Sequence, residues 1–255
     1  MIPALRASIA ILILAAATLV CIPVQWLALR LGWRLRETLP QAWHRLVLGL
    51  GGIKVTVHGR ETTDRPLMIA ANHISWIDIP VIASLTPVRF AVDMQSIRHP
   101  ILRLFAHLQP CLFLEVDGPT MAESVGTTET PLVVFAEGTT GAGNSVLPFR
   151  PDLIGSGGAA TAVPDRPLWV QPLSIAYTNV QGLPMGRQFR PVAAWTGHTR
   201  LLPHVWTVFR EYSIDAVVSW GAPFQGDSDS HSVAGKTEES VRIMTANVLT
   251  GRDPT

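Results

Sequence analysis

The stretch LMIAANHISWID, residues 67–78, decides how the rest of the sequence is interpreted. Its first five residues, Leu67–Ala71, form an apolar run with the length and composition of a buried β-strand. Polar residues follow at once, and His73 precedes Asp78 by five positions. Strand ends are where α/β proteins place reactive side chains, because the sheet holds them rigidly while the next loop reaches a ligand. The stretch therefore predicts a sheet-based fold with a reactive group at a strand end.

His73 and Asp78 have the chemistry of a general base. Histidine titrates near neutral pH, and a carboxylate on one ring nitrogen fixes the tautomer and raises the basicity of the other nitrogen. Residues five apart do not share a face of a regular helix, so we expect the pair to lie across a turn that opens a helix. Such a pair can take a proton from a hydroxyl group or from water.

Strand and helix patterns alternate along the chain after Gly51. The sequence predicts strands at 53–57, 67–71, 88–92, 111–116, 132–135, 169–177 and 215–220. It predicts helices at 78–85, 98–108 and 232–249, the last with Ser232 as its cap. We therefore expect one α/β domain, residues 51–255, with a mixed β-sheet flanked by helices and preceded by an N-terminal helical segment, residues 1–50.

The N-terminal segment has the character of a membrane anchor. No charged residue occurs from Ala7 to Leu29, a length that can cross a bilayer, although Pro23 and Gln25 also fit a helix that enters only one leaflet. A cleaved signal peptide is the alternative, but no small-x-small site follows the run. Four arginines and a single acid follow within residues 30–45, which places the main domain in the cytoplasm by the positive-inside rule.

Composition narrows the classes of protein further. Hydrophobic residues make up 47% of the chain and charged residues only 15%, so part of the surface is expected to avoid water. The net charge of +1 gives no support for nucleic-acid binding. Cys21 and Cys111 are too few for a disulfide framework, and no histidine or cysteine has metal-ligand spacing. We expect neither a metal nor a nucleic-acid partner.

A second polar turn follows another apolar run, Leu132–Phe135. Glu137 comes directly after this predicted strand, where its carboxylate would lose water unless a partner compensates. Gly138 lets the backbone come close to a ligand. A turn or helix-cap role is the alternative for Glu137.

Together these two strand ends resemble the glycerolipid acyltransferase family, of the lysophosphatidate acyltransferase type. The family's first block, Asn-His-x4-Asp, is matched at Asn72, His73 and Asp78, with the frequent Ser-Trp pair at Ser75 and Trp76.

The family's third block, Phe-Pro-Glu-Gly-Thr, is matched at residues 135–139, with Ala136 in place of proline. Residues 90–116 and 170–173 are similar to its second and fourth blocks. The resemblance covers roughly residues 53–224, with the blocks in the right order and spacing.

This resemblance implies a reaction and roles for the matched residues. His73 would take the proton of an acceptor hydroxyl, and Asp78 would orient His73. The oxygen would then attack an acyl thioester of acyl carrier protein or coenzyme A, with no other cofactor. Nearby backbone amides would stabilise the oxyanion. Glu137, Gly138 and Thr139 would position the acceptor, and Asn72, Ser75 and Trp76 are further candidates for substrate binding.

The sequence departs from the family where the acceptor's phosphate would bind. Two arginines that family members commonly carry are absent: Glu115 and Asp117 stand in the second block, and Thr140 follows Thr139 in the third. Carboxylates repel phosphate and attract an ammonium group. The hypothesis is a lyso-aminolipid acceptor, of the ornithine, glutamine or sulfur-containing kind.

Three other activities remain open at this point. Arg150, Arg187 or Arg190 could supply the missing positive charge, in which case the acceptor is lysophosphatidate. The same His-Asp pair could activate water, which makes the protein a thioester or lipid-ester hydrolase. A non-catalytic lipid-binding protein is the third alternative. The favoured reading is an acyltransferase of membrane lipid biosynthesis on the cytoplasmic face of a bacterial inner membrane.

Overall fold

The structure is a computed structural model that describes residues 2–92, 100–113, 125, 129–155, 167–196, 199–227 and 229–254. Its helices are α1 (Ile2–Leu31), α2 (Leu35–Gly51), α3 (Asp78–Leu85), α4 (Pro100–Leu108), α6 (Pro151–Gly155), α7 (Leu201–Arg210), α8 (Ser230–Leu249) and the 3-10 helix η1 (Arg190–Val192). Its strands are β1 (Ile53–His58), β2 (Leu67–Ala71), β3 (Arg89–Val92), β4 (Cys111–Phe113), β5 (Leu132–Phe135), β6 (Trp169–Val180), β7 (Leu183–Pro184), β8 (Ile214–Trp220) and β9 (Phe224–Gln225).

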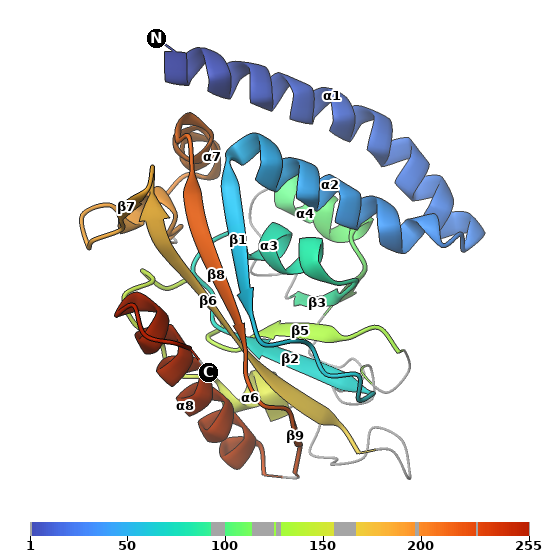
Figure 1. Cartoon of the computed structure of the whole chain (residues 1–255). Helices are drawn as coiled ribbons and strands as arrows, with labels where there is room; N and C mark the ends of the chain where they lie inside the picture. Colours follow the sequence, from blue (N-terminus) through green and yellow to red (C-terminus); the bar gives the residue numbers. More distant parts are fainter. Residues whose placement is uncertain are drawn as a thin grey trace.

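These strands form one mixed sheet with the order β1-β8-β6-β2-β5-β3-β4, and the short strands β7 and β9 pair with β6 (Figure 1). The neighbours of β2, which are β5 and β6, both run parallel to it, whereas β6 and β8 are antiparallel. Because β2 and β5 are parallel, their carboxyl ends meet at the same edge of the sheet. The predicted α/β class with a mixed sheet is confirmed.

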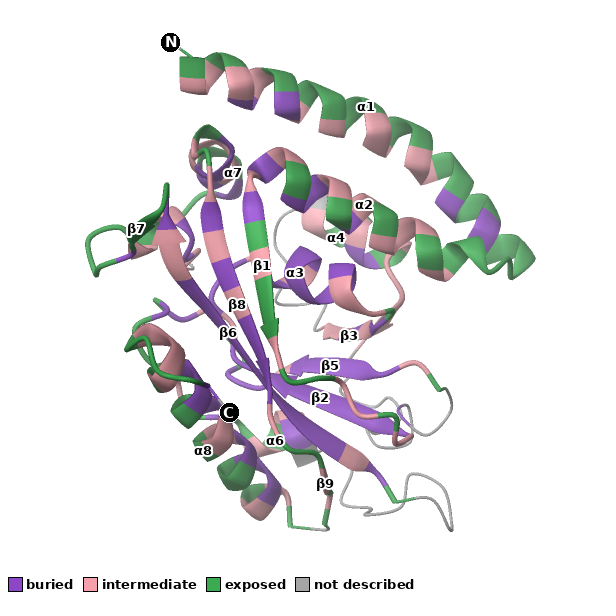
Figure 2. Ribbon diagram, in the orientation of Figure 1, coloured by how far each residue is buried: buried purple, intermediate pink, exposed green. Residues whose placement is uncertain are grey.

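Helices cover both faces of the sheet, and the burial pattern of β2 follows from this arrangement (Figure 2). All five residues of β2 are buried. Ile69 packs into the core on the face covered by α2 and α3, while Met68 packs into the core beneath α6 and α8. A strand buried on both sides has no reason to alternate with polar residues, which explains the continuous apolar run in the sequence.

The predicted elements agree closely with those observed, and the differences lie at the ends of helices and strands and in elements that were not predicted, such as α7, β7 and β9. β2 and β5 have the predicted bounds. The cap of α8 is Asp229, whose side chain accepts a hydrogen bond from the His231 N–H at 3.0 Å, and not Ser232 as predicted. Helix α7 was not predicted: Arg200 precedes it without a side-chain cap, so the sequence gives no start signal.

Helix α1 lies along the domain and touches it near both of its ends (Figure 1). Near the start, the Arg6 guanidinium donates hydrogen bonds to the carbonyls of Phe209, Glu211 and Leu50, the last at 3.1 Å. Near the other end, Gln25 Nε2 donates to the Leu108 carbonyl at 2.9 Å. α1 is the one helix among the described residues that is long and apolar enough to cross a membrane.

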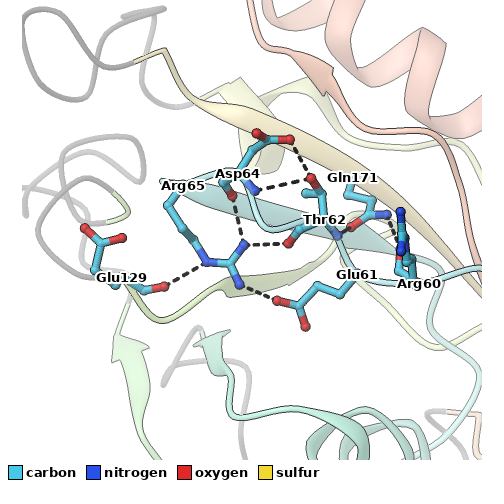
Figure 3. Close-up of polar contacts among 7 residues, drawn as sticks. All are labelled: Arg60, Glu61, Thr62, Asp64, Arg65, Glu129 and Gln171. Atoms are coloured by element: carbon cyan, nitrogen blue, oxygen red, sulfur yellow. Dashed lines mark hydrogen bonds and ion pairs between the residues drawn. The ribbon is translucent and has the colours of Figure 1, made fainter.

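The connection between β1 and β2 is held by a polar network (Figure 3). Gln171 on β6 is 1% exposed; it accepts a hydrogen bond from the Thr62 N–H and donates to the Arg60 carbonyl, both at 2.9 Å. The Arg65 guanidinium pairs with Glu61 and donates to the Thr62, Asp64 and Glu129 carbonyls. This network fixes the amino end of β2, and thereby the direction in which its carboxyl end points.

Candidate active site

His73 and Asp78 meet where β2 ends and α3 begins. His73 Nδ1 lies 2.9 Å from Asp78 Oδ2, and Asp78 is the first residue of α3. The two side chains therefore lie across a turn that opens a helix, as their spacing predicts. Oδ2 also accepts hydrogen bonds from the backbone N–H groups of Ile74 at 2.6 Å and Ser75 at 2.8 Å.

A tyrosine from a distant strand completes the surroundings of Asp78. The Tyr177 hydroxyl on β6 donates to Asp78 Oδ1 at 2.7 Å, and both residues are buried. Burial raises the pKa of Tyr177 well above its usual value, which keeps the hydroxyl protonated and able to donate. Asp78 thus accepts from four donors. Because a carboxylate only accepts hydrogen bonds, His73 carries its proton on Nδ1, and Nε2 presents a lone pair.

The two backbone amides that follow His73 serve its carboxylate partner. The backbone N–H groups of Ile74 and Ser75 donate hydrogen bonds to Asp78 and anchor the carboxylate that orients His73. His73 itself stacks on Phe135, with ring centroids 3.9 Å apart and planes inclined by 15°. This stacking fixes the plane of the imidazole from the side that faces β5.

The second predicted constellation lies next to the first one. The backbone N–H of Ala136 donates to the Ala71 carbonyl at 3.0 Å, and the N–H of Gly141 donates to the His73 carbonyl at 2.7 Å. Glu137 is 5% exposed. Its Oε1 accepts from the Leu147 N–H at 3.2 Å, whereas its Oε2 has no partner among the described residues.

Burial of Glu137 changes its charge. Loss of water raises its pKa to about 8, and the hydrogen bond from the Leu147 backbone offsets this effect only in part. The side chain is therefore mostly protonated at neutral pH and can donate a hydrogen bond as well as accept one. A neutral carboxylic acid in the turn beside His73 suits contact with a hydroxyl group better than with an anion.

Gly138 adopts the left-handed conformation, with φ of 68°, and leaves space for a neighbouring side chain. A Cβ atom at this position would lie 2.9 Å from Arg150 Cδ and 3.2 Å from Arg150 Nη1. The conformation and the contact both exclude larger residues. The Arg150 guanidinium therefore lies against the turn that carries Glu137, and it forms an exposed ion pair with Asp152.

A cavity of about 1200 Å³ opens beside His73. Trp76, Phe135, Gly138 and Arg150 line it near the dyad. Side chains of α1, α2, α4, β3 and the start of α7 line much of the rest, among them Thr18, Cys21, Trp43 and Phe105. Most of the lining is apolar. Burial lowers the pKa of His44, another lining residue, to about 4, so its ring is uncharged at neutral pH. The cavity has the size and the lining that a long apolar chain requires.

The other predicted substrate contacts differ in position. The Asn72 side chain is buried and exchanges two hydrogen bonds with the Ile175 backbone, at 2.9 and 2.8 Å, so it has no free polar atom for a substrate. Ser75 is fully buried and does not line the cavity. Trp76 lines the cavity and donates its indole N–H to His204 Nδ1 at 3.0 Å. Thr139 is exposed and Thr140 is half-exposed in the turn after Gly138.

The charged residues proposed for acceptor binding are only partly described. Glu115 and Asp117 lie outside the described residues. Arg187 is exposed, and Arg190 donates to the Gly143 carbonyl at 2.6 Å, where it supports the loop that follows Glu137. Of the three candidate arginines, only Arg150 lines the cavity that His73 lines.

Comparison with known proteins agrees with this geometry. A family model described as acyltransferase matches residues 54–175. A lyso-ornithine lipid O-acyltransferase of Rhizobium meliloti (strain 1021) is 38% identical, over 97% of this chain and 88% of that protein. A protein of the same name from Brucella abortus (strain 2308) is 36% identical, over 99% of this chain and 98% of that protein.

A solved structure shares the fold. The crystal structure of the 1-acyl-sn-glycerophosphate acyltransferase PlsC from Thermotoga maritima aligns with a TM-score of 0.61 and 19% sequence identity. The alignment covers 96% of this chain and 97% of that chain, so the likeness includes the N-terminal helices as well as the sheet.

Proposed function

The chain belongs to the acyltransferase family, and from this premise we propose that it transfers a fatty acyl group from an acyl thioester to the hydroxyl group of lyso-ornithine lipid. One combined observation carries the proposal. The His73–Asp78 pair opens onto a large apolar cavity, in a chain that aligns along nearly its whole length with lyso-ornithine lipid O-acyltransferases.

The geometry of the dyad supports direct transfer. His73 Nε2 takes the proton of the acceptor hydroxyl while the hydroxyl oxygen attacks the thioester carbonyl carbon. The tetrahedral intermediate collapses with cleavage of the carbon–sulfur bond, and the leaving thiolate takes the proton from His73. Asp78 stabilises the imidazolium that exists between these two proton transfers. No metal or other cofactor enters this sequence of steps.

The thioester carrier is acyl carrier protein or coenzyme A, and the acyl chain occupies the apolar cavity. The acceptor hydroxyl must then approach from the side of His73 that Gly138 and Arg150 line. Glu137 is buried behind this turn and holds it through the hydrogen bond from the Leu147 N–H, without lining the cavity itself. The mainly apolar lining of the cavity also disfavours water as a competing nucleophile, which favours transfer over hydrolysis.

The enzyme works at the membrane, with α1 lying in the plane of the bilayer. The face of α1 turned away from the domain carries a stripe of exposed apolar side chains, among them Ile2, Leu5, Ile9, Leu12, Leu19 and Trp26. The opposite face packs on the domain through Ala7, Ala10 and Ala28. Insertion of the exposed stripe into one leaflet buries it without separating α1 from the domain. The arginines that follow α1 favour the cytoplasmic leaflet.

Assays of purified protein in mixed micelles test the proposal. Acyl carrier protein thioester and coenzyme A thioester are supplied in parallel, each with lyso-ornithine lipid, with lysophosphatidate or without an acceptor. We expect diacylated ornithine lipid as the main product and His73→Ala to abolish its formation. Faster turnover of lysophosphatidate would contradict the acceptor assignment, and release of free fatty acid without acceptor would instead identify a hydrolase. Retained activity in His73→Ala would refute the catalytic role of the dyad.

A further inference from the structure

An arginine–aspartate ion pair lies beside the reaction centre and takes no part in the steps described above. The Arg150 backbone N–H donates to the Ala136 carbonyl at 2.8 Å, which fixes the residue next to the turn that carries Glu137. Its guanidinium lies against Gly138 and lines the cavity that also contains His73. Arg150 is therefore close to the position where the acceptor hydroxyl must arrive, and the ion pair holds Asp152 beside it, outside the cavity lining.

Asp152 engages only one edge of the Arg150 guanidinium. Its Oδ1 accepts from Nε at 3.2 Å and its Oδ2 from Nη2 at 2.5 Å. The Nη1 group, which is the one beside Gly138, has no protein partner among the described residues. Nη1 can therefore donate to an anionic group in the cavity while the ion pair stays intact.

The ion pair places opposite charges side by side near the dyad. Asp152 contributes a negative charge directly beside the positive charge of Arg150, and Glu137 is mostly neutral at pH 7. Arg200 is the other arginine among the described residues that line the cavity. The cavity lining thus carries two cations, and the carboxylate paired with Arg150 is the exposed Asp152, which does not line the cavity. A head group bound at the exposed end of this ion pair meets a cation and an anion side by side, which matches a zwitterionic group. A phosphate monoester would gain contact with Arg150 but would be repelled by Asp152.

An N-acylated ornithine carries these two charges. Its α-amino group is part of an amide, which leaves a carboxylate and a side-chain ammonium group. We propose that Arg150 binds the head-group carboxylate through Nη1 and that Asp152 binds the ammonium group, so that the pair selects a zwitterionic aminolipid over a phosphate-bearing lysolipid. This inference rests on the proposed function and names the residues that would determine acceptor specificity.

Matched changes in enzyme and substrate test the two contacts separately. The substrates are lyso-ornithine lipid, its carboxyl methyl ester, its Nδ-acetyl derivative and lysophosphatidate. The enzymes are wild type, Arg150→Met, Asp152→Asn and the control Lys236→Met, which removes an ion pair with Asp227 of similar exposure on another part of the surface. The side chains of Arg150 and Asp152 are 56% and 60% exposed, so both substitutions leave the core intact.

In the wild type and in Lys236→Met, we expect esterification of the carboxylate to lower kcat/KM about ten- to a hundredfold, the effect of losing a hydrogen bond to a charged group. In Arg150→Met this penalty should shrink to less than about threefold. Likewise, Asp152→Asn should abolish the penalty of acetylating the ammonium group and should raise the relative turnover of lysophosphatidate.

The outcomes separate this inference from the function on which it rests. If wild type acylates lyso-ornithine lipid but Arg150→Met keeps the full penalty for the methyl ester, the carboxylate contact is refuted and the function stands. If Asp152→Asn still discriminates against the acetylated amine, the ammonium contact is refuted. If wild type does not acylate lyso-ornithine lipid, both the function and the specificity assignment fall.

Discussion

Asp78 is fully buried and accepts hydrogen bonds from four donors, three of which come from its own loop. The fourth donor, the Tyr177 hydroxyl, comes from β6. It binds the carboxylate oxygen that faces away from His73, so it prevents the carboxyl group from rotating. The orientation of His73 therefore depends on Tyr177, which is not one of the described residues that line the cavity. Tyr177 is a positioning residue.

Tyr177→Phe should lower kcat about tenfold and leave KM unchanged, because one buried hydrogen bond to the charged partner of His73 is lost. Ser174→Ala is the matched control. It also removes a buried hydroxyl from β6, where Ser174 bonds to Thr245 Oγ1 at 2.7 Å. The control should lose about 1 kcal/mol of stability and keep its kcat. Steady-state kinetics and thermal unfolding of both variants check this. A Tyr177→Phe enzyme that loses only stability would contradict the positioning role.

Glu137 should make stability depend on pH. The pKa of Glu137 is about 8 in the folded protein, whereas the ordinary value of 4.5 applies to the unfolded chain. Between pH 4.5 and pH 8 the folded protein therefore holds a proton on Glu137 that the unfolded chain has lost. This contribution is complete below pH 4.5 and is lost as the pH rises through 8. From pH 6 to pH 9 we expect a decrease of about 1–3 kcal/mol in the free energy of unfolding.

Glu137→Gln isolates this effect, because glutamine stays neutral over the whole range. Its unfolding temperature in detergent should fall less than that of wild type between pH 6 and pH 9. Parallel decreases in the two proteins would show that another group causes the pH dependence.

The site residues that the sequence predicts are those whose signal is local. His73 and Asp78 are five positions apart at the end of an apolar run, and Glu137 follows another such run. Tyr177 lies 99 positions from Asp78, and no periodicity connects the two. Asn72 is also ambiguous in sequence, since an amide beside a catalytic histidine can face a ligand or, as observed, continue the hydrogen bonding of β2 to β6.

Among the elements, strands were more predictable than helix ends. β2 and β5 are buried on both faces, so their apolar runs begin and end where the sheet does. β6 extends to Val180, three residues beyond its predicted end. Its last part pairs with β7 and β8, and this pairing depends on partners that the local sequence does not reveal. The contact of Tyr177 with Asp78 depends on the pairing of β6 with β2, which the sequence does not specify, so the position of Tyr177 relative to the dyad could not be inferred.

Near its start, helix α1 is attached to the domain through the guanidinium of Arg6. Arg6 binds three backbone carbonyls and lies over the Tyr212 ring, 5.6 Å from its centroid. Arg6→Met should leave these carbonyls without a charged donor and lower the free energy of unfolding by about 2–3 kcal/mol. Arg34→Met, at an exposed position of the same segment, should change it by less than about 0.5 kcal/mol. Thermal unfolding in detergent compares them, and equal effects would refute the anchoring role.

On the scale of the whole molecule, the contacts of α1 decide how the enzyme meets a bilayer. A helix of 30 residues is about 45 Å long, and a spanning orientation would carry one end far from the domain. Contacts near both ends, through Arg6 and Gln25, oppose that separation. The sequence left a spanning and an in-plane helix open, because both need the same apolar content. Only the packing of α1 against the domain favours the second.

Labelling from the two sides of the membrane tests the in-plane arrangement. Single cysteines are introduced at Ser8→Cys, which is half-exposed on α1 outside the apolar stripe, and at Arg34→Cys, after Cys21 and Cys111 have been changed to serine. In inverted inner-membrane vesicles, an impermeant maleimide should react at both positions, and in intact spheroplasts at neither. Labelling after detergent treatment serves as the control for reactivity. Reaction of the two positions from opposite sides would instead show that α1 spans the bilayer.

The wall that α1 contributes to the cavity has a consequence for handling the protein. Thr18, Cys21 and Gln25 of α1 line the same cavity as His73, so the helix proposed to lie in the bilayer also forms part of the proposed acyl-chain site. Removing residues 1–33 to obtain a more soluble fragment would open the cavity along that side. Detergents used for extraction will compete for the same helix, and their choice becomes a variable of every activity measurement.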